Sequence, residues 1–127
     1  MYPHARSLGQ QLVTMSELLE RGIGPVFDDL AERLAGRPVY VCWDMDFFDP
    51  SVAPGAFTPS WGGATVREGL DIARRLGRLD IVAVDINTVS PLHDVGGLTA
   101  FLCARVILEF LTGLAAKALH HPAREIP

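Results

Sequence analysis

The chain has 127 residues, of which 49% are hydrophobic and 20% charged, with 15 acidic residues, 11 basic residues and a net charge of −4. This length suits one domain with a buried core, so residues 1–127 are taken as a single domain. The acidic balance, with no block of positive charge, excludes the basic surface that binds a phosphate backbone, and we expect no nucleic-acid partner. The apolar content exceeds what a small interior usually needs, so we expect some of it to face a partner.

Three features predict where the protein works. The chain begins with no succession of basic, apolar and small residues, so we expect no signal peptide. Cys42 and Cys103 lie in apolar runs, which is typical of reduced, buried thiols, with a disulfide as the minor alternative. The most apolar stretch, residues 97–119, is long enough to span a membrane, but three charged side chains interrupt it. We therefore predict a cytoplasmic protein with no membrane partner and a buried helix in this stretch.

The first third of the chain predicts two helices. Residues 1–10 have no clear period, and we expect an extended segment whose neighbours lie in sequence outside this chain. Thr14 and Glu17 fit a capping box at the start of a short helix. Pro25 suits the first turn of a second helix, which Gly36 is expected to cap.

Strands and helices alternate from residue 38 onward. Residues 39–43 form a continuous apolar run, which predicts a strand buried on both faces. Residues 49–63 hold three prolines and three glycines and predict a long ordered loop. Residues 65–76 have helical spacing, residues 79–86 read as a second apolar strand, and a helix is expected over residues 98–111. This order predicts an α/β fold, a partial three-layer parallel sheet with flanking helices.

Several large apolar side chains are assigned to packing rather than to chemistry. Trp43 and Trp61 belong to this group. The last helix carries an apolar stripe that we expect in the core or in an interface, and it consists of Phe101, Leu102, Val106, Leu108 and Phe110. A parallel sheet cut in half would leave an unpaired strand and bare apolar surface, which favours self-association, so we expect a homo-oligomer.

Asp44 and Asp46 are the most informative residues because they follow the first predicted strand. In extended chain, residues two apart point the same way with Cα atoms roughly 6.5 Å apart, so both carboxylates can aim at one point. Ligands of parallel α/β sheets bind beyond the carboxyl ends of the strands. Converging carboxylates repel unless a cation lies between them, and oxygen ligands favour magnesium, calcium or manganese. Two solvated turn aspartates remain the alternative.

The surrounding sequence carries two linked motifs. Residues 41–50 read Val-Cys-Trp-Asp-Met-Asp-Phe-Phe-Asp-Pro, and residues 53–63 hold an Ala-Pro-Gly, a Thr-Pro and a Gly-Gly. These strings resemble the Ser-x-Asp-x-Asp-x-x-Asp-Pro motif and the Ala-Pro-Gly-x-x-Thr-Pro-x-x-Gly-Gly loop of the ureohydrolase (arginase/agmatinase) family, with Cys42 in place of the serine. Weaker similarity, most like agmatinases, covers almost the whole chain. The resemblance implies the carboxy-terminal half of an arginase-like domain.

The resemblance also implies an activity and its cofactor. The family hydrolyses a small guanidino substrate to urea and an amine with two Mn²⁺ ions. Its first aspartate bridges both ions and the second chelates one, roles that would fall on Asp44 and Asp46, while Asp49 is expected to cap a turn. The other ligands of the family come from upstream histidine-containing segments whose strings do not occur here. We therefore predict a fragment that binds manganese weakly and is inactive alone, and we assign no catalytic residue.

Two further residues are candidates for substrate contact. The family ends its later strand with Asp-x-x-Glu-x-x-Pro, whose glutamate pairs with the guanidinium, whereas Thr88 stands at that position here. A hydroxyl cannot give the bidentate, charge-assisted pairing that a guanidinium prefers, so the substrate stays open. His93, in the second loop, is the other candidate. The remaining histidines, which we expect to be solvated, are His4, His120 and His121.

Three readings therefore compete. The first is an agmatinase-like, manganese-dependent enzyme of which this chain is a part. The second is a non-catalytic ureohydrolase-like protein that binds a ligand or a partner subunit through its apolar edge. The third, magnesium held by Asp44 and Asp46 in an unrelated phosphotransfer domain, leaves the Pro-Gly loop unexplained.

Overall fold

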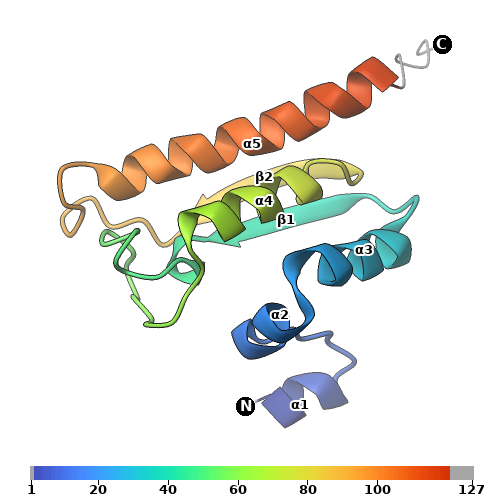
Figure 1. Cartoon of the computed structure of the whole chain (residues 1–127), viewed down its shortest axis with the longest axis horizontal. Coiled ribbons are helices and arrows are strands. Elements are labelled where there is room, and N and C mark those ends of the chain that lie inside the picture. The colour runs from blue at the N-terminus through green and yellow to red at the C-terminus, as the bar shows by residue number, and fades with distance from the viewer. Residues whose placement is uncertain (1, 121–127) are drawn as a thin grey trace.

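The structure, a computed structural model, describes residues 2–120 and has a small two-stranded sheet with helices packed on one side, while the first helix lies apart from the sheet (Figure 1). In chain order, its elements are α1 (Tyr2–Ser7), α2 (Met15–Arg21), α3 (Ile23–Leu34), β1 (Val39–Asp44), the 3-10 helix η1 (Met45–Phe47), α4 (Val66–Leu76), β2 (Ile81–Asn87) and α5 (Leu98–His120). The two strands pair in parallel, and α4 connects them. The predicted α/β class is confirmed.

The amino-terminal helices follow their local signals, with one exception. Thr14 caps α2 as predicted: its hydroxyl accepts from the amide of Glu17 at 3.2 Å, and the Glu17 carboxylate accepts from the amide of Thr14 at 2.7 Å. Pro25 lies in the first turn of α3, and Gly36 follows that helix with a φ of 71°. The prediction of an extended segment over residues 1–10 is wrong, because residues 2–7 form α1. That helix leaves its side chains largely exposed, so no apolar period marks it.

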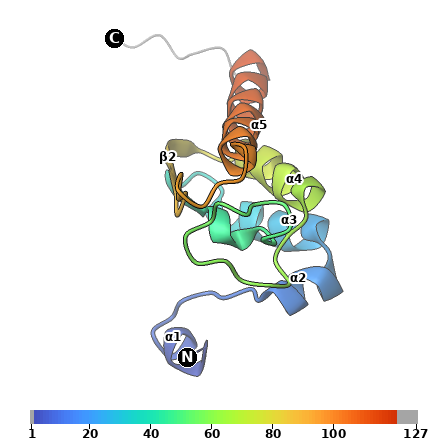
Figure 2. The same cartoon turned by 90° about the vertical axis from the view of Figure 1, so that its left-hand side faces the viewer.

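The sheet buries one face and leaves the other open. Val41 and Trp43 point into the core, where α4 contributes Ile72 and Ala73 and α5 contributes Leu102, Val106 and Phe110. Tyr40, which is 60% exposed, and Cys42 point to the opposite face. The predictions that this strand is buried on both faces and that Cys42 is a buried thiol are therefore wrong for the described residues. The reason is that α4 and α5 both lie on one side of the sheet (Figure 2).

The apolar assignments divide between core and surface. Trp43 lies in the core, with ring centroids 5.8 Å from Phe47 and 5.7 Å from Phe110, as predicted. Trp61 is 82% exposed in the loop over residues 49–63, so its assignment to packing is wrong. A Pro- and Gly-rich loop leaves an aromatic ring no strand or helix face to pack on.

Helix α5 is longer than predicted and has a buried and an exposed side. Leu102, Val106 and Phe110 are buried, while Phe101 and Leu108 are exposed. By length and composition alone, the segment from Leu98 to Leu119 would be able to cross a membrane, and 33% of its most apolar window is buried in the fold. Glu109 on this helix accepts from Arg74 of α4 at 2.9 Å and from Arg105 at 2.5 Å. A buried carboxylate with two guanidinium partners suits the interior of a layered fold, so we keep the interpretation of α5 as a core helix.

Candidate functional site

The predicted metal ligands lie where both strands end. Asp44 is the last residue of β1 and pairs in register with Asn87, the last residue of β2. Asp46 follows in η1, so the chain turns between the two aspartates instead of continuing extended as the spacing argument assumed. The turn brings the backbone amide of Asp46 to 3.3 Å from Oδ1 of Asp44. Both aspartates therefore belong to one tight turn at the carboxyl edge of the sheet.

Each of these carboxylates accepts a hydrogen bond from a threonine hydroxyl, and the two threonines lie in different loops. The hydroxyl of Thr88, the residue after β2, donates to Oδ1 of Asp44, and its oxygen accepts from the amide of Met45 at 3.1 Å. The hydroxyl of Thr58, in the loop over residues 49–63, donates to Oδ2 of Asp46 at 2.5 Å. The contact of Thr88 with Asp44 joins the ends of β1 and β2 across 44 residues of sequence. Sequence reasoning placed Thr88 near the site but missed this partner.

Asp49 organises the loop that carries Thr58. Its carboxylate accepts from the amides of Ser51 and Gly62, both at 2.9 Å, which closes the loop onto its own start. Hydrogen bonds from Ser51 and then from the amide of Gly62 lower the pKa of Asp49. A Cβ at Gly63 would lie 2.5 Å from the backbone nitrogen of Asp49, so only glycine fits there. The predicted turn-capping role of Asp49 is confirmed.

Asp94 fixes the second loop against the first. Its carboxylate accepts from the amides of Thr99 and Ala100 at 2.9 and 3.0 Å, at the start of α5. The Thr99 amide is the largest of the bonds that lower the pKa of Asp94. The Thr99 hydroxyl accepts from the amide of Gly55 at 2.8 Å, and a Cβ at Gly55 would lie 2.7 Å from that of Asp94. The two loops are thus locked together beside the aspartates.

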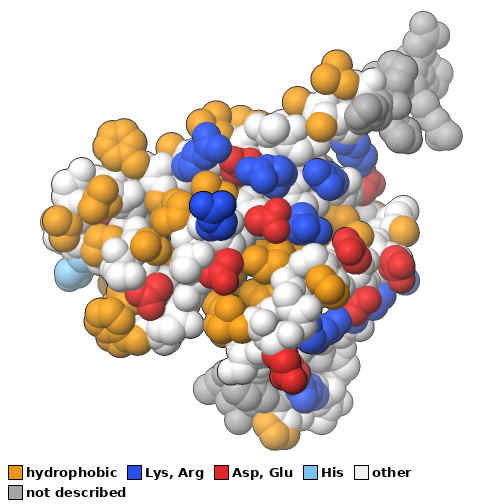
Figure 3. All heavy atoms as spheres, viewed as in Figure 1, with side chains coloured by type: hydrophobic (Ala, Val, Ile, Leu, Met, Phe, Trp, Pro, Cys, Tyr) orange, Lys and Arg blue, Asp and Glu red, His pale blue; other side chains and the backbone are white. Residues whose placement is uncertain are grey.

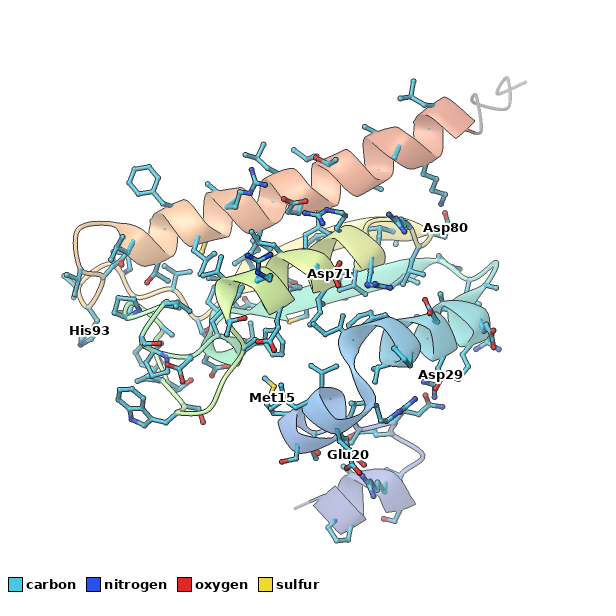
Figure 4. All side chains as sticks on the ribbon, viewed as in Figure 1. Met15, Glu20, Asp29, Asp71, Asp80 and His93 are labelled. Atoms are coloured by element: carbon cyan, nitrogen blue, oxygen red, sulfur yellow. The ribbon has the colours of Figure 1, made fainter. Side chains whose placement is uncertain are left out.

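His93 lies on the exposed side of this loop pair. It sits at the end of the molecule opposite Asp80, which precedes β2 (Figure 4). Its Nδ1 lies 2.7 Å from the hydroxyl of Ser90, the one hydrogen bond of this side chain within the described residues. The same two loops carry four exposed apolar side chains, Phe57, Trp61, Leu92 and Val95. Figure 3 shows hydrophobic side chains on the surface at this end of the molecule. The role proposed for His93 in substrate contact therefore stays a prediction.

The residues present fit a hard divalent ion in type and fall short in number. Asp44 and Asp46 offer carboxylate oxygens, which are ligands that manganese and magnesium accept. Within residues 2–120, no group of three or more histidine, cysteine or acidic side chains is close enough to hold a metal. His4 is exposed on α1, and the side chain of His120 and the whole of His121 lie outside the described residues. A complete site needs ligands beyond those this part of the chain supplies.

Comparison with known proteins identifies the family of the chain. The model of the arginase family matches residues 2–113. The chain belongs to the arginase family. Its fold is therefore arginase-like, and the sequence resemblance to ureohydrolases is confirmed.

Three relatives show how the chain lies within this family. Proclavaminate amidinohydrolase from Streptomyces clavuligerus is 43% identical over 108 residues, covering 85% of this chain and 34% of the relative. Its solved structure superposes with a TM-score of 0.86, covering 92% of this chain and 39% of that one. Guanidinopropionase from Pseudomonas aeruginosa is 38% identical over 90% of this chain, and agmatinase from Proteus mirabilis is 34% identical over 90%, covering 36% and 37% of those relatives. The chain thus spans about a third of the length of the curated relatives it matches.

Proposed function

We propose that the protein is part of a manganese-dependent amidinohydrolase that cleaves a small guanidino compound to urea and an amine. The observation that carries this proposal is the pair Asp44 and Asp46, held in one turn at the carboxyl edge of a sheet that belongs to the arginase family. The remaining ligands would come from family sequence beyond these 127 residues, in the same polypeptide or in a partner chain. We propose a cytoplasmic location for the same activity.

The residues of this chain would have three roles: binding the metal, restraining its carboxylate ligands and closing the loops around them. Asp44 and Asp46 would hold manganese, which when bound lowers the pKa of water enough to supply a nucleophile at neutral pH. Thr58 and Thr88 restrain the two carboxylates through hydrogen bonds. Asp49 and Asp94 close the two loops that frame this edge. A rigid frame of this kind keeps the two carboxylates in one arrangement when an ion and a substrate bind.

The candidate substrates are small guanidino compounds, of which agmatine is only one. Agmatine is one candidate because the motifs resemble those of agmatinases and one matched relative, 34% identical, is an agmatinase. Proclavaminate amidinohydrolase and guanidinopropionase are more similar, at 43% and 38% identity, so their substrates are equally candidates. Thr88 cannot offer a guanidinium the charge that a glutamate at this position would. Either another carboxylate of the complete site takes that role, or the substrate is recognised mainly through its other end.

The decisive experiment measures urea release by the intact gene product. The purified protein, loaded with manganese, is offered agmatine, arginine, 4-guanidinobutyrate and 3-guanidinopropionate. We expect urea from at least one of them, and loss of that activity in an Asp46→Asn variant that keeps its fold by circular dichroism. Release of no urea from any of the four compounds would reject the proposal.

A second candidate, a non-catalytic member of the family that binds a ligand or a partner subunit, is favoured by the open sheet face and by Thr88. Tyr40 and Val82, which are both exposed, would then contact another subunit. Sedimentation velocity tests this candidate. Association into a defined oligomer, together with no urea release, supports it, and a strictly monomeric, well-behaved chain counts against it.

A further inference from the structure

Thr88 has an unusual backbone for its residue type. Its φ is 60°, and it is the one residue other than glycine with a positive φ within residues 2–120. A β-branched side chain is strongly disfavoured in this left-handed region, and such residues persist only where the surrounding structure holds them. The backbone around Thr88 is held by the neighbouring loop: its carbonyl accepts from the amide of Phe57 at 2.7 Å, and the amide of Ser90 donates to Gly55 at 2.7 Å.

The left-handed backbone aims the hydroxyl at Asp44. A hydroxyl has one proton to donate and two lone pairs to accept with. The amide of Met45 can only donate, so it uses an acceptor site of Thr88 at 3.1 Å. An ionised carboxylate can only accept, so the hydroxyl proton goes to Asp44, although the carbonyl of Asn87 also lies 2.8 Å away. Thr88 therefore bonds the side chain of Asp44 and the amide of the next residue at once.

We propose that Thr88 is a positioning residue that fixes the orientation of the Asp44 carboxylate for a divalent cation. This inference rests on the proposed function, because it takes Asp44 as a metal ligand. This role would account for the strained backbone of Thr88: the residue keeps an unfavourable positive φ because in that conformation its hydroxyl reaches Asp44. Partners that orient a ligating side chain commonly change metal affinity about 10–100-fold when they are removed.

Three substitutions separate the hydroxyl from the shape and strain of the side chain. Thr88→Ser keeps the hydroxyl and drops the β-branch. Thr88→Val keeps the β-branch and drops the hydroxyl. Thr88→Gly drops both and relieves the left-handed backbone, so its fold is expected to be at least as stable as that of Thr88→Val. Thr112→Val is the matched control, since among residues 2–120 that hydroxyl bonds only to the carbonyl of Leu108 in the same helix.

The primary measurement is the Mn²⁺ affinity of each variant of the protein, read from the electron paramagnetic resonance of free Mn²⁺ in a titration. We expect Thr88→Ser and Thr112→Val to stay within about 3-fold of the unmodified protein, and Thr88→Val and Thr88→Gly to bind about 10-fold more weakly. Unchanged affinity in Thr88→Val and Thr88→Gly overturns the inference. So does equal weakening in Thr88→Ser, because the hydroxyl would then not be the cause.

A second readout keeps the inference testable if the metal proposal itself fails. The chemical shift of the Met45 amide proton and its temperature coefficient report the hydrogen bond to Thr88 without any metal. We expect the bonded values in Thr88→Ser and their loss in Thr88→Val and Thr88→Gly. If the unmodified protein binds no manganese, the proposed role of Asp44 and Asp46 is rejected, and an unchanged Met45 amide in all three variants overturns the positioning role as well.

Discussion

The substitution Gly69→Ala should loosen the turn that carries the predicted metal ligands, although it lies on a helix. Gly69 is buried in α4, and a Cβ there would lie 2.1 Å from Cε1 and 2.3 Å from Cζ of Phe48. The Phe48 ring is fully buried and contacts Trp43 and Phe47, with centroids 5.9 and 5.8 Å away. To reach ordinary contact, the ring would have to move by roughly 1.3 Å into packed neighbours.

Two opposing effects determine how far Gly69→Ala changes the free energy of unfolding. Alanine in a helix interior is more favourable than glycine by about 1 kcal/mol. Overpacking a filled core costs about 1–3 kcal/mol. Because the clash falls on a fully buried ring, we expect the overpacking to outweigh the helix preference and the free energy of unfolding of Gly69→Ala to fall by about 1–2 kcal/mol. Phe48 lies two residues after Asp46, so the displacement would also reach the turn.

The assay is urea denaturation of a double-mutant cycle. Phe48→Leu removes the two ring atoms that clash, so adding Gly69→Ala to that background should be neutral or stabilising by up to about 1 kcal/mol. The cycle therefore predicts a coupling free energy of about 1–3 kcal/mol between positions 48 and 69. A Gly69→Ala protein as stable as the unmodified one, with no coupling to Phe48→Leu, would refute the packing of α4 on the Phe48 ring.

Two other predictions concern ionisable groups. The hydrogen bond from Arg74 lowers the pKa of Glu109, so the stability that this pair contributes is present above the ordinary glutamate pKa of 4.5 and is lost as the pH falls through the lower folded value. Glu109→Gln should lower the free energy of unfolding by about 1–2 kcal/mol at pH 7 in urea denaturation. If the difference in stability between the two proteins did not shrink below pH 4.5, this prediction would be wrong. Burial raises the pKa of the Cys103 thiol, whereas Cys42 is exposed on the open face. Maleimide should therefore label Cys42 first in the native protein, Cys42→Ser should remove the fast phase, and equal rates at both thiols would show that the open face is covered.

Local signals in the sequence predicted most of the fold. The capping box at Thr14 and the apolar period of residues 65–76 predicted α2 and α4, because caps and amphipathic faces depend on residues within one or two helical turns of each other. The open sheet face was missed because an apolar run looks the same whether one or both faces are covered. Helix α1 was missed because it buries no stripe.

The sequence predicted the residues of the candidate site but not the hydrogen bonds between them. Asp44, Asp46 and Thr88 were singled out by motif resemblance, while the hydrogen bond from Thr88 to Asp44 depends on the pairing of β1 with β2. Contacts across 44 residues leave no mark in a single sequence. A β-branched residue gives no warning that it adopts a left-handed backbone, so the strain at Thr88 had no sequence signal.

The assignment of Asp44 and Asp46 as metal ligands can be tested by calorimetric titration of Mn²⁺ into the protein, beside an Asp44→Asn/Asp46→Asn double variant. Circular dichroism must first show that both are folded. We expect weak, saturable binding that the double variant loses, because these two carboxylates supply part of a metal site. Equal binding by both proteins, or none by the folded unmodified protein at millimolar Mn²⁺, would contradict the assignment of Asp44 and Asp46 as metal ligands of this chain.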